Sequence, residues 1–209
     1  MSEGKLLQAK GIRQFEDHDY EGAAQTFKSA IDAFQQESDV IGMAEMQVNL
    51  GLAYRAMDNY DEAIQLMESG LATFREQKNR RLEAQAMGNM ALAYSKQGNQ
   101  EQAATFYREA AAIFRDLGDD DNYGETVLAL ADMLFKSGNL MQAVAAYEAG
   151  LEAIRNPTQR QKMAKQLLVV KNRLMGEKRA EQAGEEGKTV SDRRRRRQLR
   201  RGDQEKESS

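Results

Sequence analysis

Four sets of similar residues recur along the first three quarters of the chain at a spacing of 40 residues. One set is all alanine, one is Phe, Met or Tyr, one is Ala or Gly, and one is Phe or Ile. The sets are Ala23, Ala63, Ala103 and Ala143; Phe27, Met67, Tyr107 and Tyr147; Ala30, Gly70, Ala110 and Gly150; and Phe34, Phe74, Phe114 and Ile154. A period of this length, kept in four sets at once, predicts stacked copies of one supersecondary unit.

Within a unit, the four sets lie on one face of an α-helix. In the third unit they fall at i, i+4, i+7 and i+11, from Ala103 to Phe114, and residues at this spacing share a side that must be buried. The small residues allow two helix axes to approach closely, while the bulky ones fill the gap to the next unit. Each unit is therefore predicted to be a hairpin of two antiparallel helices.

Turn-forming residues mark the expected helix ends. A pair ending in Asp or Asn divides each unit, at positions where Gly and Asn tolerate left-handed backbone. These pairs are His18-Asp19, Asp58-Asn59, Gly98-Asn99 and Gly138-Asn139. Between units, Asp39, Asn79 and Asp119 are expected N-caps that accept hydrogen bonds from the first free amides. With one proline in 209 residues and much Ala, Gln, Glu, Leu and Met, the sequence predicts an all-α fold.

These residues resemble the tetratricopeptide repeat (TPR), whose pattern places Leu-Gly and Tyr on the first helix and Ala, an aromatic residue and Ala on the second. The second unit shows the pattern most clearly, with Leu50-Gly51, Tyr54 and Ala63. The resemblance implies a right-handed α-solenoid of four TPR hairpins, at about residues 5–38, 39–78, 79–118 and 119–155. The period exceeds the family's usual length of about 34 residues. It is similar to the variant repeats of kinesin light chains and G-protein-signalling modulators, which are peptide-binding adaptors.

The periodic sets stop near Pro157, and two further segments are predicted beyond it. An apolar stripe that includes Met163 and Leu167 predicts a helix over 157–180. This helix would cap the open apolar end of the solenoid. Residues 184–209 have almost nothing to bury and are predicted to be a disordered, Arg-rich tail.

The resemblance implies that ligands lie along the concave surface formed by the first helix of each hairpin. Asn49 and Asn89 occupy one equivalent position there, and an amide side chain both donates to and accepts from a bound peptide backbone. The alternative is that both asparagines are simply tolerated surface residues. By register, the candidate peptide-binding groove comprises Gln8, Ile12, Val48, Asn49, Leu52, Arg55, Gln85, Asn89, Leu92, Lys96, Leu128 and Lys136.

Chaperone-binding members of the family grip a free C-terminus with lysine, asparagine and arginine side chains. This chain keeps Asn49, but Gln8 and Ile12 stand at the first clamp lysine and asparagine positions. Gln85 and Asn89 stand where the later lysine and arginine belong. The sequence therefore predicts, as the ligand, an internal or partly apolar segment of a partner protein.

Charge is unevenly distributed along the chain. Residues 1–155 carry 14 Lys and Arg against 25 Asp and Glu, whereas residues 156–209 carry 16 against 8. The basic tail suits an anionic partner, since the guanidinium fork binds phosphates well. Nucleic acid, anionic lipid, an acidic protein and the acidic repeats themselves all remain open, and a ribonucleoprotein-associated factor is the alternative function. The tail residues are Arg193, Arg194, Arg195, Arg196, Arg197, Arg200 and Arg201.

Catalytic and metal-binding residues are scarce. The chain has no cysteine and one histidine, His18, which falls at a predicted turn. Residues 119–122 are acidic but lack the glycine and distal glutamate of a calcium loop. We therefore expect a non-enzymatic scaffold or adaptor without a metal or cofactor. No stretch approaches the roughly 20 apolar residues of a membrane span, so a cytoplasmic protein is expected. The oligomeric state is left open.

Overall fold

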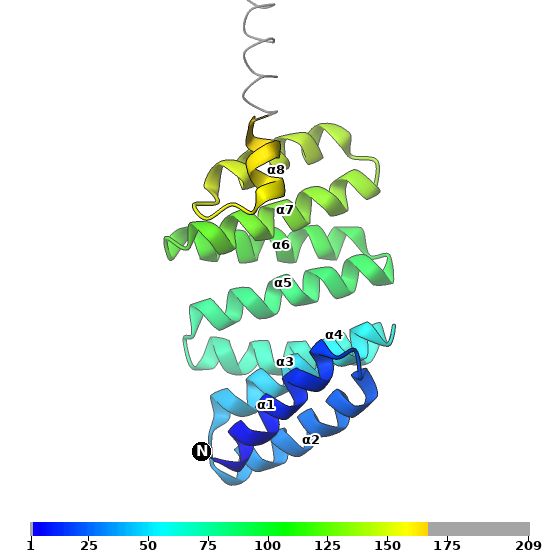
Figure 1. Cartoon of the computed structure of the whole chain (residues 1–209), viewed down its shortest axis with the longest axis vertical. Coiled ribbons are helices and arrows are strands. Elements are labelled where there is room, and N and C mark those ends of the chain that lie inside the picture. The colour runs from blue at the N-terminus through cyan, green and yellow to red at the C-terminus, as the bar shows by residue number, and fades with distance from the viewer. Residues whose placement is uncertain (1, 167–209) are drawn as a thin grey trace, which may run out of the picture. The chain divides into compact units, whose positions relative to one another are not determined.

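The computed structural model describes residues 2–166, which form helices α1 to α8 and a further helical stretch at 159–166 (Figure 1). The helices are α1 (Glu3–Glu16), α2 (Tyr20–Gln36), α3 (Val40–Ala56), α4 (Tyr60–Glu76), α5 (Arg80–Gln97), α6 (Gln100–Asp116), α7 (Asp120–Lys136) and α8 (Leu140–Ala153). The chain divides into two compact units, Met1–Pro157 and Thr158–Ser209. The first unit contains all eight labelled helices.

In the first unit, α1–α2, α3–α4, α5–α6 and α7–α8 form four hairpins that stack in chain order (Figure 1). Each helix packs chiefly on the helices before and after it, and α1 with α3 and α3 with α5 also meet. Short-range packing of this kind defines a solenoid. The predicted all-α solenoid of helical hairpins is confirmed.

The periodic residues form the core. The four alanines of the first set are all 0% exposed, and Phe34, Phe74, Phe114 and Ile154 are between 1% and 3% exposed. A methyl group added at Gly70 would lie 2.8 Å from the Ala44 carbonyl oxygen. Small residues therefore bring paired helices into backbone contact, as the spacing predicts.

The same left-handed turn closes every helix junction between α1 and α8. Inside the hairpins, positive φ angles occur at the first residue of each predicted pair, from 62° at Asp58 to 96° at Gly98. Between hairpins, Ser38, Lys78 and Gly118 adopt φ of 57°, 54° and 68°. The predicted N-caps are also present, since Asp39 Oδ1 accepts from the Gly42 amide at 2.8 Å. Asn79 and Asp119 make the equivalent bonds at 3.2 and 3.3 Å.

Replacing Lys78 by Gly is expected to stabilise the fold by about 0.5–1 kcal/mol. Left-handed backbone destabilises an L-residue by about 1–2 kcal/mol, and glycine removes this strain. The net gain is smaller, because glycine also has a greater conformational entropy in the unfolded state. Gly118 occupies the same register with φ 68°, so Gly118→Lys is the reverse control and should destabilise. The urea denaturation midpoints of Lys78→Gly and Gly118→Lys measure the two changes in stability. A less stable Lys78→Gly variant would contradict the strain argument.

The second unit is described only over residues 158–166. Its helical stretch begins with a capping box, in which the Thr158 hydroxyl accepts from the Gln161 amide at 3.4 Å. The Gln161 side chain in turn accepts from the Thr158 amide at 2.7 Å. The predicted capping helix at 157–180 thus lies partly outside the described residues. The predicted disordered tail at 184–209 lies wholly outside them.

Candidate functional site

A pocket of about 170 Å³ opens between the first helices of the first three hairpins. Helices α1, α3 and α5 supply most of its wall, and α4 supplies one aromatic ring. The lining residues are Gln8, Glu45, Val48, Asn49, Phe74, Leu82, Gln85, Ala86 and Asn89. Four side-chain amides, one carboxylate and four apolar side chains therefore line the same pocket.

Glu45 is the charged group of the pocket. Its side chain is half-buried, and burial raises its pKa above the ordinary glutamate value. The nearby Asp39 carboxylate raises the pKa further, and a hydrogen bond from Gln8 opposes the shift. Among residues 2–166, Glu45 makes no ion pair. The pocket thus holds a carboxylate whose charge no described side chain balances.

Five of the predicted groove residues lie together in the pocket: Gln8, Val48, Asn49, Gln85 and Asn89. Asn49 and Asn89 are half-buried, whereas Val48 is only 7% exposed. Val48 packs on α4, because a methyl group added at Gly70 would lie 2.8 Å from its Cγ2. Val48 is therefore mainly a core residue whose edge reaches the pocket.

The other predicted groove residues lie outside the pocket. Ile12 is 39% exposed, Lys96 and Lys136 are exposed, and Leu52 and Leu92 are half-buried. Leu128 packs against α8, since a methyl group added at Gly150 would lie 3.0 Å from its Cγ. The predicted set therefore divides into five residues that line the pocket and others, on the same three helices and on α7, that do not. The predicted anionic-partner tail, Arg193 to Arg201, falls outside the described residues.

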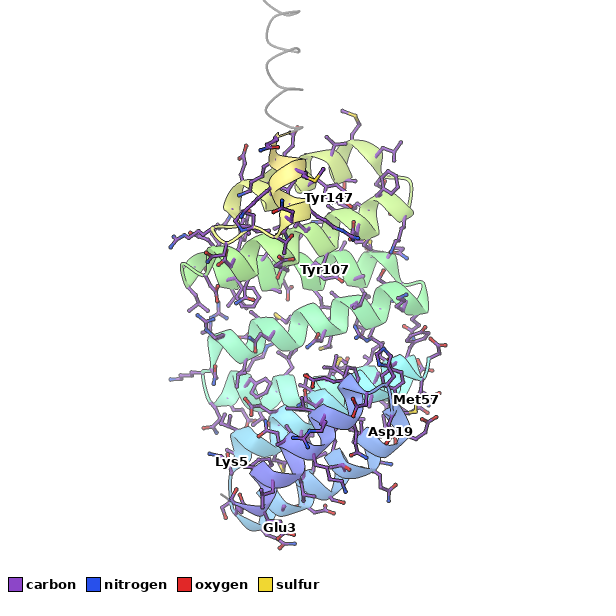
Figure 2. All side chains as sticks on the ribbon, in the orientation of Figure 1. Glu3, Lys5, Asp19, Met57, Tyr107 and Tyr147 are labelled. Carbon is purple, nitrogen blue, oxygen red and sulfur yellow. The ribbon has the colours of Figure 1, made fainter. Side chains whose placement is uncertain are left out.

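Arg55, also a predicted groove residue, points partly into the protein. Its Nη1 is buried and makes no hydrogen bond among the described residues, and burial lowers the guanidinium pKa. Electrostatic interactions with Tyr107 and Tyr60 oppose this lowering of the pKa. Tyr107 lies on α6 (Figure 2), and burial raises its pKa to about 12. Arg55 is thus less accessible to a ligand than the sequence suggested.

A family model of the tetratricopeptide repeat matches residues 42–116. This stretch runs from the first turn of α3 to the end of α6. These residues are tetratricopeptide repeats. The match spans the second and third hairpins, which supply all but one of the pocket-lining residues. TPRs generally mediate protein–protein interactions, and the all-α repeat fold is typically non-enzymatic.

Among solved structures, the TPR fold described here is similar to the crystal structure of BtubC (BKLC) from P. vanneervenii. The TM-score is 0.65 at 17% sequence identity, and the likeness covers 75% of this chain. It covers 64% of that chain, so this protein spans less than two thirds of that structure's length. At this identity the likeness shows the fold. No curated protein matches the sequence.

Four lining residues were not predicted: Glu45, Phe74, Leu82 and Ala86. A signal for Glu45 was present, because it lies one helical turn before Asn49, as Gln85 lies one turn before Asn89. Phe74 was identified as a core position, and its ring reaches the pocket from α4. The repeat register could therefore have placed Glu45 among the groove residues, next to Asn49.

The acidic residues at the start of α7 have structural partners. Asp119 caps α7, Asp120 pairs with Arg155, and Asp121 accepts a hydrogen bond from the Arg155 amide at 2.7 Å. Within residues 2–166, no group of three or more His, Cys, Asp or Glu side chains is placed to hold a metal ion. None of the described helices is long and apolar enough to cross a membrane.

Replacing Glu45 by Gln is expected to raise the melting temperature slightly at pH 7. The raised pKa means that folded Glu45 binds a proton more readily than unfolded Glu45. Its ionised form therefore destabilises the fold above the folded-state pKa, and the penalty vanishes below the unfolded-state value of about 4.3. Thermal melts of both proteins from pH 7 to pH 3.5 test this. A gain that persists unchanged at the lowest pH would contradict the electrostatic cause.

Proposed function

We propose that this protein is a non-enzymatic scaffold that binds an extended segment of a partner protein along the concave side of its TPR hairpins. The observation that carries the proposal is the meeting of Gln8, Asn49, Gln85 and Asn89 in one pocket. Amides pair with a peptide backbone in both directions, so such a surface holds an extended chain largely independently of its side chains.

The pocket chemistry suits binding better than catalysis. Amide side chains are neither nucleophiles nor general bases at neutral pH. Among the described lining residues, Glu45 supplies the single carboxylate and there is no histidine. A volume of about 170 Å³ lies well below the several hundred Å³ of usual small-molecule sites. It matches one side chain of a longer ligand that runs across the groove.

The combined change Asn49→Ala and Asn89→Ala is expected to weaken peptide binding about tenfold or more. Each lost amide removes hydrogen bonds worth about 0.5–1.5 kcal/mol, and about 1.4 kcal/mol is a factor of ten. The probe is a set of peptides selected from a random display library on the full chain. Fluorescence anisotropy then gives Kd for the wild type and the variant.

Asn59→Ala with Asn139→Ala is the matched control. Both asparagines stand at helix starts without a side-chain capping bond, and neither lines the pocket. The control should leave Kd within about twofold, which is within the ±0.5 kcal/mol expected of neutral surface changes. Equal affinities for wild type and pocket variant, or equal losses in pocket variant and control, would refute the groove proposal.

The alternative function, an anionic partner bound by the Arg-rich tail, rests on sequence alone. Deleting residues 184–209 separates the two proposals. Binding by the tail would weaken steeply with salt and vanish on deletion, whereas groove binding would survive the deletion. Retention of peptide binding by the truncated chain is the expected result.

A further inference from the structure

We propose that the pocket between α1, α3 and α5 selects one basic side chain, a lysine or an arginine, from the bound segment, with Glu45 as its charge partner. This inference rests on the proposed peptide-binding function and adds the chemistry of the partner. It follows from the charge of the pocket, from the hydrogen-bond acceptors that its side chains offer, and from its apolar walls.

The charge of the pocket favours a cation. Glu45 lines the pocket without an ion pair among the described residues, and its charged neighbour Asp39 is another carboxylate. A buried carboxylate costs free energy unless it is paired and hydrogen-bonded. The raised pKa of Glu45 reflects that cost. A ligand cation would supply the missing partner, whereas an acidic side chain would be repelled by both carboxylates.

The amides complete the recognition of such a cation. An ammonium carries three donors and a guanidinium five, and neither has an acceptor. The side-chain oxygens of Gln8, Asn49, Gln85 and Asn89 are acceptors around the same space as the Glu45 carboxylate. An apolar ligand side chain would cover the Glu45 carboxylate and the amide oxygens of the pocket without offering them a hydrogen-bond donor, which is unfavourable.

The walls suit the stem of a basic residue. Val48, Phe74, Leu82 and Ala86 form the apolar part of the lining. The methylene groups of lysine and arginine pack on such surfaces while the charged head reaches a polar site. The wider field acts in the same direction, because residues 1–155 hold 25 acidic against 14 basic side chains. A net negative surface of this kind speeds the encounter with basic segments.

The test uses positional-scanning peptide libraries on the full chain, in which one position is fixed in turn as Lys, Arg, norleucine, Gln or Glu. On the wild type, Lys and Arg should be preferred over Gln and norleucine about tenfold at one position, as expected for a charge-assisted hydrogen bond. Glu45→Gln should remove that preference while Asn49- and Asn89-dependent binding remains. Glu45→Lys should reverse it, so that Glu is preferred.

Glu125→Gln is the matched control. Glu125 is exposed at the register of Glu45 on α7 and does not line the pocket, so this change removes the same charge from the acidic repeats. It should keep the preference for Lys and Arg. If Glu45→Gln and Glu125→Gln reduce the preference equally, the selection comes from the overall field and the site is refuted.

The two proposals fail in different ways. Peptides that bind through Asn49 and Asn89 with no preference for a basic residue would overturn the basic-side-chain site and leave the scaffold function standing. A complete absence of peptide binding, in libraries of every fixed residue, would overturn both.

Discussion

Replacing Phe34 by Ala is expected to lower the free energy of unfolding by about 3–5 kcal/mol. Phe34 on α2 is 1% exposed, and its ring faces two other helices. A methyl group added at Gly4 on α1 or at Gly42 on α3 would lie 2.7 or 2.6 Å from a ring atom. One side chain therefore packs against the backbone of two neighbouring helices. Its removal leaves a cavity that backbone atoms cannot fill without moving whole helices.

Phe135→Ala is the chemically identical control. Phe135 on α7 is 60% exposed, so its truncation should change stability by no more than about 0.5 kcal/mol. Urea denaturation followed by circular dichroism measures both variants. Similar losses at the two positions would contradict the claim that Phe34 owes its effect to burial between three helices.

The loss of stability caused by Phe34→Ala should appear first in the helices that contact Phe34. Each helix packs chiefly on its sequence neighbours, and stability in such an array is close to a sum of hairpin and interface terms. Amide hydrogen exchange in Phe34→Ala is therefore expected to rise first in α1, α2 and α3. The amides of α7 should keep their protection longest. Uniform acceleration through all eight helices would indicate a single cooperative unit instead.

Local features of the fold were predictable because each depends on residues close in sequence. The helix faces follow from spacing within one helix, and the caps at Asp39, Asn79 and Asp119 need only the next few amides. Turn position was predictable too, through register. The left-handed turns between hairpins were not predicted, because Ser38 and Lys78 have no preference for that backbone and Gly118 is the one glycine at this register.

The pocket was only partly predictable, because its shape depends on how neighbouring helices pack against each other. Register placed Asn49 and Asn89 together, and both line the pocket. It could not show that Val48 turns toward Gly70, or that Phe74 of a second helix reaches the same space. Such details depend on side-chain direction between helices, which the periodic pattern does not specify.

The same substitution, Gly to Ala, is expected to have opposite effects at two glycines on first helices of neighbouring hairpins. At Gly88 on α5, an added methyl group would meet no atom within 4 Å. Alanine there should stabilise the protein by about 0.5–1 kcal/mol, because glycine loses more backbone entropy in a helix. Thermal and urea denaturation of the two single variants give the comparison.

At Gly51 on α3, the added methyl group would lie 2.8 Å from the Ala63 carbonyl oxygen and 2.8 Å from Met67 Cγ. Met67 can change rotamer, but the carbonyl belongs to the backbone of α4, so α3 and α4 must move apart. We expect Gly51→Ala to destabilise by about 1–3 kcal/mol despite the gain in helix propensity. A stabilised Gly51→Ala variant would show that the hairpin can widen freely. In that case the small residues of the repeat would not be what sets the distance between its helices.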